Sequence, residues 1–569
     1  MELPVGYCSA LKTMNRLSVR SPWLALAGTL LVVAAVLVSN TLVEEAFGRA
    51  PHSLAWGPAL FRALLAVHGF GLVLAGFLPR QHRTTPAGNP INRQTYLLLT
   101  ALTVVAVLLR LPSLNSCLWL DEILTLVNYA RPPLARIFTS FPDQNQHLLY
   151  SLLAHCSMRV FGEQAWSLRL PAVFFGVGSV WALFLLGRRL MGESEALLAS
   201  LLMTVSYHHI WFSQNARGYT GLLFFTILAT WLWLEAMEGD RWRTWLAYAV
   251  SVALGLSIHM TMLFVPATHA LIFLVVWFRS GREKERLGRA AAAFALCGTL
   301  ALQVYALSLP EFFRTAASEV SPPSEWTHPL WVVTETLRNL RVGFAGVAVV
   351  LCGGLLAAAG WVGLLRRSPR AAWAMVLPGV LGGGSMLALG HNLWPRFFFF
   401  CMGFGLLILV HGAMQLPAMM VRLLRLPDRW SMRVGYALAG LMVAASLSTV
   451  PRCYALPKQD FTGARDYVER QQLPGDVVMV VGLAAHAYAY YAPAWPEART
   501  ATELTALVQN RPRAFLIYTL PIELRAAHPD LWKAVENDFE TVRVFPGTLG
   551  GGEVYVCRER STLSGKRPI

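Results

Sequence analysis

Two adjacent carboxylates, Asp121 and Glu122, stand at the end of an apolar run in the motif Leu118-Trp-Leu-Asp-Glu122. A carboxylate in this place can act as a general base and take a proton from an attacking hydroxyl group. The same two residues can instead cap the N-terminus of the amphipathic helix that follows them. The two roles are compatible, and the sequence alone leaves both open.

Three further clusters of polar residues also lie next to apolar runs: Asp143 with His147, Gln214 with Arg217 and Tyr219, and Arg396. Each has a plain structural interpretation as a polar turn, a helix cap or an arginine that snorkels to lipid headgroups. An arginine can also clamp a phosphate group with two parallel hydrogen bonds. Acids and arginines at one membrane face therefore suit a reaction on a lipid-linked phosphate, with an arginine on the phosphate and a carboxylate as the base.

Composition places these clusters in a membrane protein. The chain has 569 residues, of which 55% are hydrophobic and only 14% are charged, and its mean hydropathy is +0.47. Soluble proteins carry about 25% charged residues, so lipid is the expected solvent for most of the chain. The net charge of +16 could indicate nucleic acid, but the basic residues lie between apolar runs and form no groove-like cluster. We therefore expect membrane lipids, and no nucleic acid, as partners.

Apolar runs of roughly 20 residues predict about thirteen membrane-spanning helices. These runs occupy residues 22–40, 57–78, 95–112, 167–187, 195–212, 218–237, 243–259, 260–278, 290–308, 343–365, 371–390, 396–418 and 434–450. A cytoplasmic N-terminus puts most basic residues of the short loops inside, as the positive-inside rule requires. The loops 112–166 and 309–342 and the segment 451–569 then face the extracytoplasmic side of a bacterial inner membrane.

The segment 451–569 differs in character from the rest of the chain. Blocks of strand length at 476–481, 514–518, 541–545 and 553–557 alternate with amphipathic stretches at 461–471 and 521–537. Strands that alternate with helices predict a small α/β domain. The glycines at 547–552 are more typical of a hairpin turn than of a phosphate-binding loop. The expected fold is an all-α polytopic membrane protein with a small extracytoplasmic α/β domain at its C-terminus.

Cysteine pairing is left open by the sequence. Cys117 and Cys156 fall in the first outer loop, and Cys453 and Cys557 flank the C-terminal domain. An oxidising compartment would permit a disulfide within each couple, but free thiols are the expectation.

The order of these motifs resembles the polytopic, lipid-phosphosugar-dependent glycosyltransferases of the GT-C superfamily. The nearest likeness is to the bacterial branch related to protein O-mannosyltransferases and to the aminoarabinose transferase of lipid A. The matching segments are 118–122, 143–150, 161–171, 187–192, 209–219 and 460–478. The resemblance implies a GT-C membrane core at 95–450, behind an additional N-terminal hairpin at 1–94.

The resemblance also implies roles for the polar clusters. Asp121 would be the catalytic base that activates the acceptor, with Glu122 beside it as a second catalytic residue, and Arg217 would bind the donor phosphate. The implied substrate-binding residues are Asp143, His147, Gln214, Arg217, Tyr219 and Arg396.

Two of these positions depart from the family pattern. Leu148 and Leu149 follow His147, where relatives often carry two prolines. Phe397 follows Arg396, where relatives often carry a tyrosine. The family pattern therefore supports the assignments of His147 and Arg396 less strongly than that of Asp121.

The expected function is the inverting transfer of a sugar from a polyprenyl-phosphate donor to a lipid, glycan or protein acceptor. The leaving phosphate needs no general acid if cations hold it. This scheme requires no cofactor, although the two carboxylates could hold a divalent metal ion. The alternative is a polytopic transporter or lipid flippase, a class that places ionisable groups at the midplane of the membrane. Here the charges gather at the outer interface, which favours the enzyme.

Overall fold

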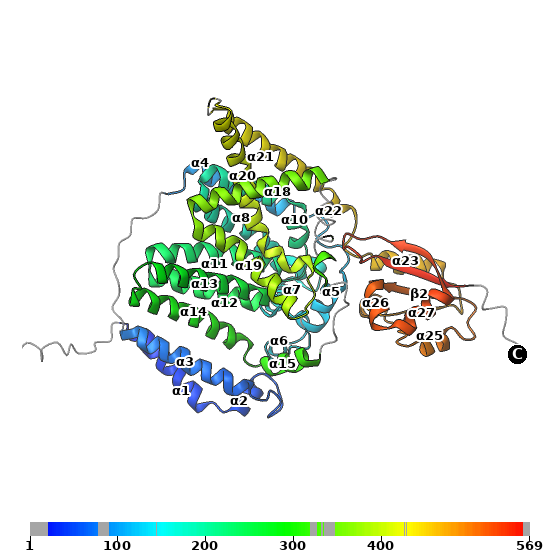
Figure 1. Cartoon of the computed structure of the whole chain (residues 1–569). Helices are drawn as coiled ribbons and strands as arrows, with labels where there is room; N and C mark the ends of the chain where they lie inside the picture. Colours follow the sequence, from blue (N-terminus) through cyan, green and yellow to red (C-terminus); the bar gives the residue numbers. More distant parts are fainter. Residues whose placement is uncertain are drawn as a thin grey trace, which may run out of the picture. The chain divides into compact units, whose positions relative to one another are not determined.

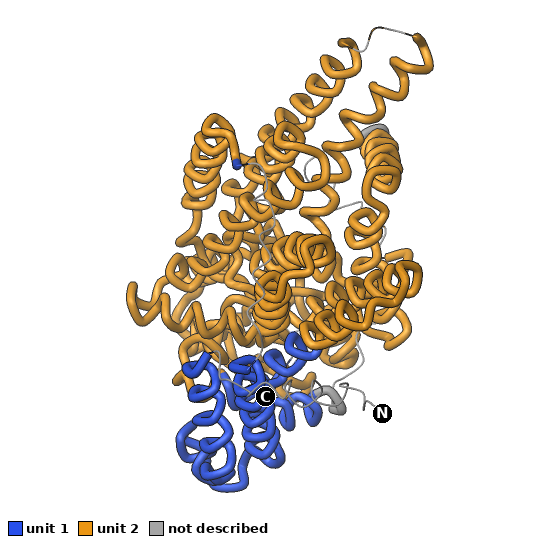
Figure 2. Tube along the Cα trace, turned by 90° about the vertical axis from the view of Figure 1, so that its left-hand side faces the viewer, with its two compact units in different colours: residues 1–90, 138–144, 295–319 blue, residues 91–137, 145–294, 320–569 orange. Residues whose placement is uncertain are grey.

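The computed structural model describes residues 21–77, 90–143, 145–318, 327–331, 334, 347–425, 427 and 429–560. The chain is mostly helical, with one small sheet near the C-terminus (Figure 1). It divides into two compact units (Figure 2): residues 1–90, 138–144 and 295–319 form unit 1, and residues 91–137, 145–294 and 320–569 form unit 2. Every site residue proposed above belongs to unit 2 except Asp143, which belongs to unit 1.

Unit 1 is built on two closely packed helices, α1 (Pro22–Leu37) and α3 (Gly57–Phe77). Small residues allow the close approach, since a Cβ added to Gly28 would lie 2.4 Å from the carbonyl oxygen of Gly69. The expected span 22–40 ends earlier, at Leu37, because α2 (Asn40–Ala46) turns away from α1 by 103°. The unit also contains α15 (Leu309–Ser318).

Unit 2 contains a large helical part between residues 93 and 455 and the C-terminal domain, and α6 and α14 of the helical part also have residues in unit 1. In chain order the elements are α4 (Arg93–Leu108), α5 (Leu120–Leu124), η1 (Thr125–Ala130), α6 (Leu134–Thr139), α7 (Leu148–Phe161), α8 (Ala165–Met191), α9 (Glu193–Thr204), α10 (Tyr207–Ser213), α11 (Tyr219–Gly239), α12 (Trp242–Ile258), η2 (Met260–Leu263), α13 (Phe264–Arg279), α14 (Lys284–Tyr305), α18 (Val347–Arg367), α19 (Pro369–Ala388), η3 (Pro395–Cys401), α20 (Met402–Leu423), α21 (Arg429–Thr449) and α22 (Arg452–Ala455).

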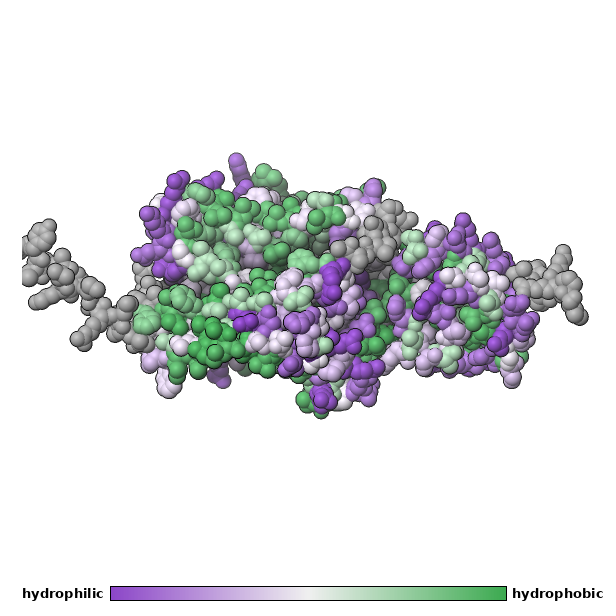
Figure 3. Space-filling model, turned by 90° about the horizontal axis from the view of Figure 1, so that it is seen from below, coloured by the Kyte–Doolittle hydropathy of each residue, from purple (hydrophilic) through white to green (hydrophobic). Residues whose placement is uncertain are grey.

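A polytopic membrane architecture is confirmed. Within the described residues, nine helices are long and apolar enough to cross a membrane, or ten if α1 and α2 form one bent span. Hydrophobic residues cover much of the helical surface seen in Figure 3, whereas hydrophilic residues prevail on the C-terminal domain. The number of thirteen spans stays a prediction, and most of the expected outer loop 309–342 lies outside the described residues.

The fifth expected span, 195–212, is not one continuous helix. It breaks after Thr204, at the end of α9, and resumes as α10. The fully buried Arg110 lies at the break, where Nη1 is 3.5 Å from the carbonyl oxygen of Thr204 and Nη2 is 2.6 Å from Nδ1 of His209. A helix can break in a membrane when other groups satisfy the freed backbone, and Arg110 does so here.

The C-terminal α/β domain is confirmed. Its elements are α23 (Phe461–Gln471), β1 (Val477–Val480), α24 (Ala484–Tyr491), α25 (Ala501–Val508), β2 (Ala514–Thr519), α26 (Pro521–Ala527), α27 (Pro529–Asp538), β3 (Phe539–Phe545) and β4 (Val554–Glu559). The sheet order is β1-β2-β4-β3, with β1 parallel to β2 and the other pairs antiparallel.

The glycines at 547–552 join the antiparallel pair β3 and β4, so they form the expected hairpin turn. Cys117, Cys156, Cys453 and Cys557 are all free in the structure.

Candidate active site

Glu122 is fixed by a buried ion pair with Arg169 of α8. Both side chains are fully buried, and Nε and Nη2 of Arg169 donate to the two carboxylate oxygens at 2.8 and 2.6 Å. The remaining guanidinium nitrogen, Nη1, donates to the carbonyl oxygen of Leu114 at 2.8 Å. The carboxylate also accepts the backbone N–H of Ala216 at 2.7 Å. Glu122 therefore ties the first outer loop to α8 and to the loop before α11.

The charge of Glu122 is maintained by its surroundings. Burial alone would raise the pKa of Glu122, but the positive charges of Arg169 and Lys458 and the hydrogen bonds from Arg169 and Ala216 hold it below its ordinary value. An ionised carboxylate with every lone pair occupied is a poor proton acceptor. The geometry thus favours a structural role for Glu122 over the catalytic role that the resemblance implies.

Asp121 has a different environment, although it is the adjacent residue. Its side chain keeps some exposure, and Oδ2 lies 3.3 Å from Nη1 of Arg396. Arg396 stands at the start of η3, directly after Pro395, and its guanidinium lies over the ring of Trp394 at 4.7 Å. Nε of Arg396 is buried and has no hydrogen-bond partner among the described residues.

Arg217 belongs to the same site as Asp121 and Arg396. Its Nη1 donates to the carbonyl oxygen of Asn145 at 2.7 Å, and the guanidinium lies 5.9 Å from the centre of the Tyr219 ring. Arg217 is 4% exposed, so it does not extend into the lipid headgroups as a free snorkelling side chain would. Its Nε is buried and donates no hydrogen bond to any described residue.

Two histidines and a tyrosine line the same site. The ring centre of His147 lies 5.8 Å from that of Tyr219 and 4.7 Å from that of His259. Nδ1 of His147 lies 2.9 Å from the carbonyl oxygen of Ile258 and donates to it, because a carbonyl oxygen can only accept. Burial and the nearby charges of Arg217 and His259 hold the pKa of His147 well below its ordinary value.

His259 has the opposite arrangement of donor and acceptor. Its Nδ1 accepts the backbone N–H of Thr261 at 3.2 Å, so a neutral ring carries its proton on Nε2. In neutral His147, by contrast, Nε2 carries the lone pair. The pair thus offers the site one ring donor and one ring acceptor, a combination suited to sugar hydroxyl groups.

Gln214 binds backbone groups within unit 2, and Asp143 belongs to unit 1. The side-chain amide of Gln214 is buried and donates to the carbonyl oxygen of Arg110 at 3.0 Å. It therefore anchors the end of the third expected span. Asp143 is half-buried in unit 1. Substrate binding by Gln214 and Asp143 stays a prediction, and the contacts of Gln214 give it no support.

Sequence reasoning missed two important residues. Arg169 lies within an apolar run, and a charged residue in such a run is normally paired and functional, so its position was the available signal. His259 is the second residue that the sequence did not single out. It reaches the site only through the break between α12 and η2, which no local pattern predicts.

Metal binding by the two carboxylates does not fit this geometry. Asp121 pairs with Arg396 and Glu122 with Arg169, so the carboxylates have different, positively charged partners. Along the described part of the chain, no group of three or more His, Cys, Asp or Glu side chains is arranged to hold a metal ion. Metal dependence stays an untested prediction.

Comparisons with known proteins show that this chain is similar to mannosyltransferases. Residues 145–305 match the family model described as dolichyl-phosphate-mannose-protein mannosyltransferase. YkcB of Bacillus subtilis, a candidate mannosyltransferase, is 27% identical over 146 residues, which are 26% of this chain and 20% of YkcB. The chain thus matches about a fifth of the length of that relative.

Two solved structures have a similar arrangement of helices. ArnT from Cupriavidus metallidurans is 12% identical with a TM-score of 0.46, and the match covers 83% of this chain and 99% of ArnT. The archaeal oligosaccharyltransferase AglB from Archaeoglobus fulgidus, solved with an inhibitory peptide and a dolichol-phosphate, is 12% identical with a TM-score of 0.48, covering 81% and 74%. The family match over residues 145–305, which include His147, Arg217 and His259, confirms the resemblance of this chain to the lipid-phosphosugar-dependent glycosyltransferases.

Proposed function

We propose that this chain is a membrane glycosyltransferase that moves a sugar from a polyprenyl-phosphate donor to a hydroxyl or amino group of a lipid, glycan or protein acceptor. The observation that carries the proposal is the pairing of Asp121 with Arg396 at 3.3 Å, beside Arg217. Both arginines keep a buried Nε–H without a partner among the described residues. Such donors suit the oxygens of a phosphate. The family match over residues 145–305 supports the same substrate class.

In the proposed reaction, the acceptor oxygen or nitrogen attacks the anomeric carbon of the sugar. The bond from that carbon to the phosphate oxygen breaks, and polyprenyl phosphate leaves with the electron pair. The acceptor proton passes to the carboxylate of Asp121. One displacement of this kind inverts the anomeric centre, and the arginines stabilise the charge that develops on the leaving phosphate.

Arg396 links donor binding to the base. Arg396 pairs with Asp121 at 3.3 Å. A donor phosphate competes for the same guanidinium, so donor binding frees the Asp121 carboxylate to accept a proton. The base is thereby exposed when a sugar is present to be transferred.

The proposed location is a bacterial inner membrane, with the site on the extracytoplasmic side. The positive-inside distribution of basic residues supports this orientation. Asp121, Arg217 and Arg396 all lie at ends of helices on the side proposed to be external, where both a membrane-anchored donor and an external acceptor can reach them.

The test is the fate of a donor labelled in its sugar, supplied to the purified protein in proteoliposomes. A transferase releases polyprenyl phosphate and passes the label to an acceptor from a cell-envelope extract. A flippase moves the intact donor between leaflets, which a membrane-impermeant oxidant of sugar diols detects. Movement without release of polyprenyl phosphate would contradict the proposed function and favour the transporter alternative.

A further inference from the structure

The segment 118–120, which leads into α5, forms hydrogen bonds with two different parts of the protein. Trp119 has an extended backbone, with φ −89° and ψ 172°, so neighbouring residues face opposite ways. Trp119 faces the helical part of unit 2, where its indole Nε1 donates to Oδ1 of Asn215 at 3.0 Å. Its backbone N–H lies 3.3 Å from Oε2 of Glu122. The backbone N–H groups of the residues on either side, Leu118 and Leu120, bind side chains of the C-terminal segment instead.

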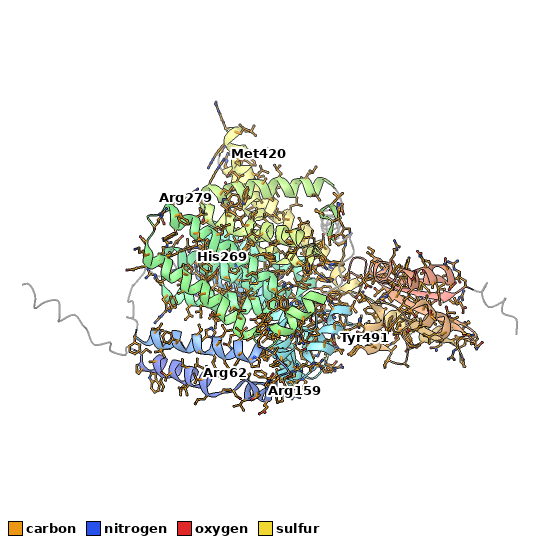
Figure 4. All side chains as sticks on the ribbon, turned by 60° about the horizontal axis from the view of Figure 1, so that its bottom comes forward. Arg62, Arg159, His269, Arg279, Met420 and Tyr491 are labelled. Carbon is orange, nitrogen blue, oxygen red and sulfur yellow. The ribbon has the colours of Figure 1, made fainter. Side chains whose placement is uncertain are left out.

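Tyr491 binds Leu118 through its hydroxyl group. The hydroxyl oxygen accepts the backbone N–H of Leu118 at 2.7 Å and donates to the carbonyl oxygen of the same residue at 3.2 Å. Tyr491 is the last residue of α24 and lies where the C-terminal domain meets this segment (Figure 4). One side chain of the domain therefore holds both backbone groups of a residue three positions before Asp121.

Gln459 binds Leu120, the residue directly before Asp121. Its Oε1 accepts the backbone N–H of Leu120 at 3.1 Å. Its Nε2 donates at 3.1 Å to Oγ1 of Thr519 at the end of β2 and at 3.1 Å to the carbonyl oxygen of Gly552 in the hairpin. The side chain is fully buried. It joins the sheet of the C-terminal domain to the N-terminus of α5 through one amide group.

Lys458 extends the same junction to the loop before α11. The side chain is buried, and Nζ donates to the carbonyl oxygen of Gln214 at 2.6 Å, above the ring of Trp211 at 5.3 Å. The indole Nε1 of Trp211 donates to Oγ1 of Thr548 in the hairpin at 2.8 Å. The hairpin packs closely here, since a Cβ on Gly547 would lie 2.2 Å from the carbonyl oxygen of Lys458.

We propose that the C-terminal domain is a latch for the catalytic base, with Tyr491 and Gln459 as positioning residues for Asp121. This inference rests on the proposed function. Backbone N–H groups that lose a buried partner cost free energy. Without these two side chains the segment 118–120 would shift to find other partners, and Asp121 would shift with it. The C-terminal domain thereby helps to set the position of the catalytic base.

The latch should affect turnover more than donor binding. The described contacts of Arg217 are with Thr125, Asn145 and Tyr219, and Arg396 contacts Asp121 and its own neighbours. None of these partners belongs to the C-terminal domain. Loss of the latch should therefore lower kcat more than it changes the KM for the donor, which depends on Asp121 only through the competition for Arg396.

The experiment compares two adjacent tyrosines. Tyr491→Phe removes the hydroxyl group that holds Leu118, whereas Tyr490→Phe changes an exposed ring that contacts the Tyr491 ring edge-on. We expect Tyr491→Phe to lower kcat by about 5-fold, as loss of one hydrogen bond allows, with a smaller change in the donor KM. Tyr490→Phe should behave as the wild type.

Gln459 supplies an independent variant pair. Gln459→Leu removes the acceptor for Leu120 and should lower kcat by about 10-fold. Gln472→Leu, at an exposed position of the same domain, is the control and should keep the turnover of the wild type. Hydrogen exchange of a peptide covering residues 117–122 reports the position of the loop without any enzyme assay, and it should be faster in Tyr491→Phe and Gln459→Leu.

The outcomes separate the latch from the proposed function. Faster exchange with a kcat that falls by a larger factor than the donor KM changes supports the latch. Unchanged exchange in both variants, or faster exchange with wild-type kcat, would overturn it. If hydrogen exchange of residues 117–122 is faster in the variants but the wild-type protein transfers no sugar, the result contradicts the proposed function and not the contact. The C-terminal domain would then hold the segment of Asp121 in a protein that does not catalyse the reaction.

Discussion

The carboxylate of Asp121 lies 3.3 Å from the guanidinium of Arg396, although 275 positions separate the two residues in the chain. One side chain comes from the first helix after α4, and the other begins the 3₁₀ turn before α20. The proposed base and a proposed phosphate ligand therefore come together only in the completed fold. Each of the two charges is compensated by the other, and in the proposed reaction a donor phosphate takes the place of the carboxylate beside Arg396.

Arg217 provides the first prediction, because lysine can replace a snorkelling cation but not a two-bond clamp. We expect Arg217→Lys to impair transfer clearly and Arg217→Ala nearly to abolish it. Arg159→Lys, at an exposed position, is the control. The measurement is the transfer rate against donor concentration at matched protein levels. Wild-type kinetics in Arg217→Lys, with only a mild loss in Arg217→Ala, would refute the clamp.

Glu122 provides a prediction on stability. Glu122→Gln leaves the buried guanidinium of Arg169 without its counter-charge, which should cost about 3–5 kcal/mol in the free energy of unfolding. Glu163→Gln is the matched control, because Glu163 forms an exposed ion pair with Arg131 and its loss should cost less than about 1 kcal/mol. Denaturant unfolding of both variants in the same detergent measures the difference. Equal stability of the two would show that Glu122 does not hold the loop.

Lys458 provides a prediction on pH. Burial lowers the pKa of Lys458 from 10.5 to about 8. Between about pH 8 and 10.5 the unfolded chain therefore binds more protons at this residue than the folded chain does, so its contribution to the free energy of unfolding rises with pH. Lys458→Met should abolish this rise. The measurement is the difference in unfolding midpoint between variant and wild type across pH 7–11, and a constant difference would contradict the shifted pKa.

Residue type and position in the sequence were enough to place Asp121, Arg217 and Arg396 at the ends of helices. The strands of the C-terminal domain also lie within about two residues of their predicted bounds, because short β-branched blocks between turn residues are a strong local signal. The short helices α24 and α25 were missed, since eight residues give little helical periodicity.

The division of roles between Asp121 and Glu122 could not be predicted. The two carboxylates are chemically alike and adjacent, so only their partners distinguish them. Arg169, 47 positions away, binds both oxygens of Glu122 and leaves Asp121 to face Arg396. Pairing at such separations depends on the packing of helices, which the local sequence does not encode.

Topology is tested by reporter fusions. A fusion after Arg282, in the basic loop between α13 and α14, should report a cytoplasmic location, and a fusion after Gly475, in the C-terminal domain, an extracytoplasmic one. The reason is the excess of basic residues in the inside loops. A cytoplasmic reporter at Gly475 would place the latch and the site on the wrong side for an external acceptor.

The most direct test of the proposed function is the turnover of Asp121→Asn. Asparagine keeps the size of the side chain and its hydrogen-bonding capacity but cannot accept the acceptor's proton. We expect kcat to fall at least 10²-fold, with thermal stability near that of the wild type, while Asp530→Asn, at an exposed position, keeps full activity. Near-normal kcat in purified Asp121→Asn would contradict the assignment of Asp121 as the base.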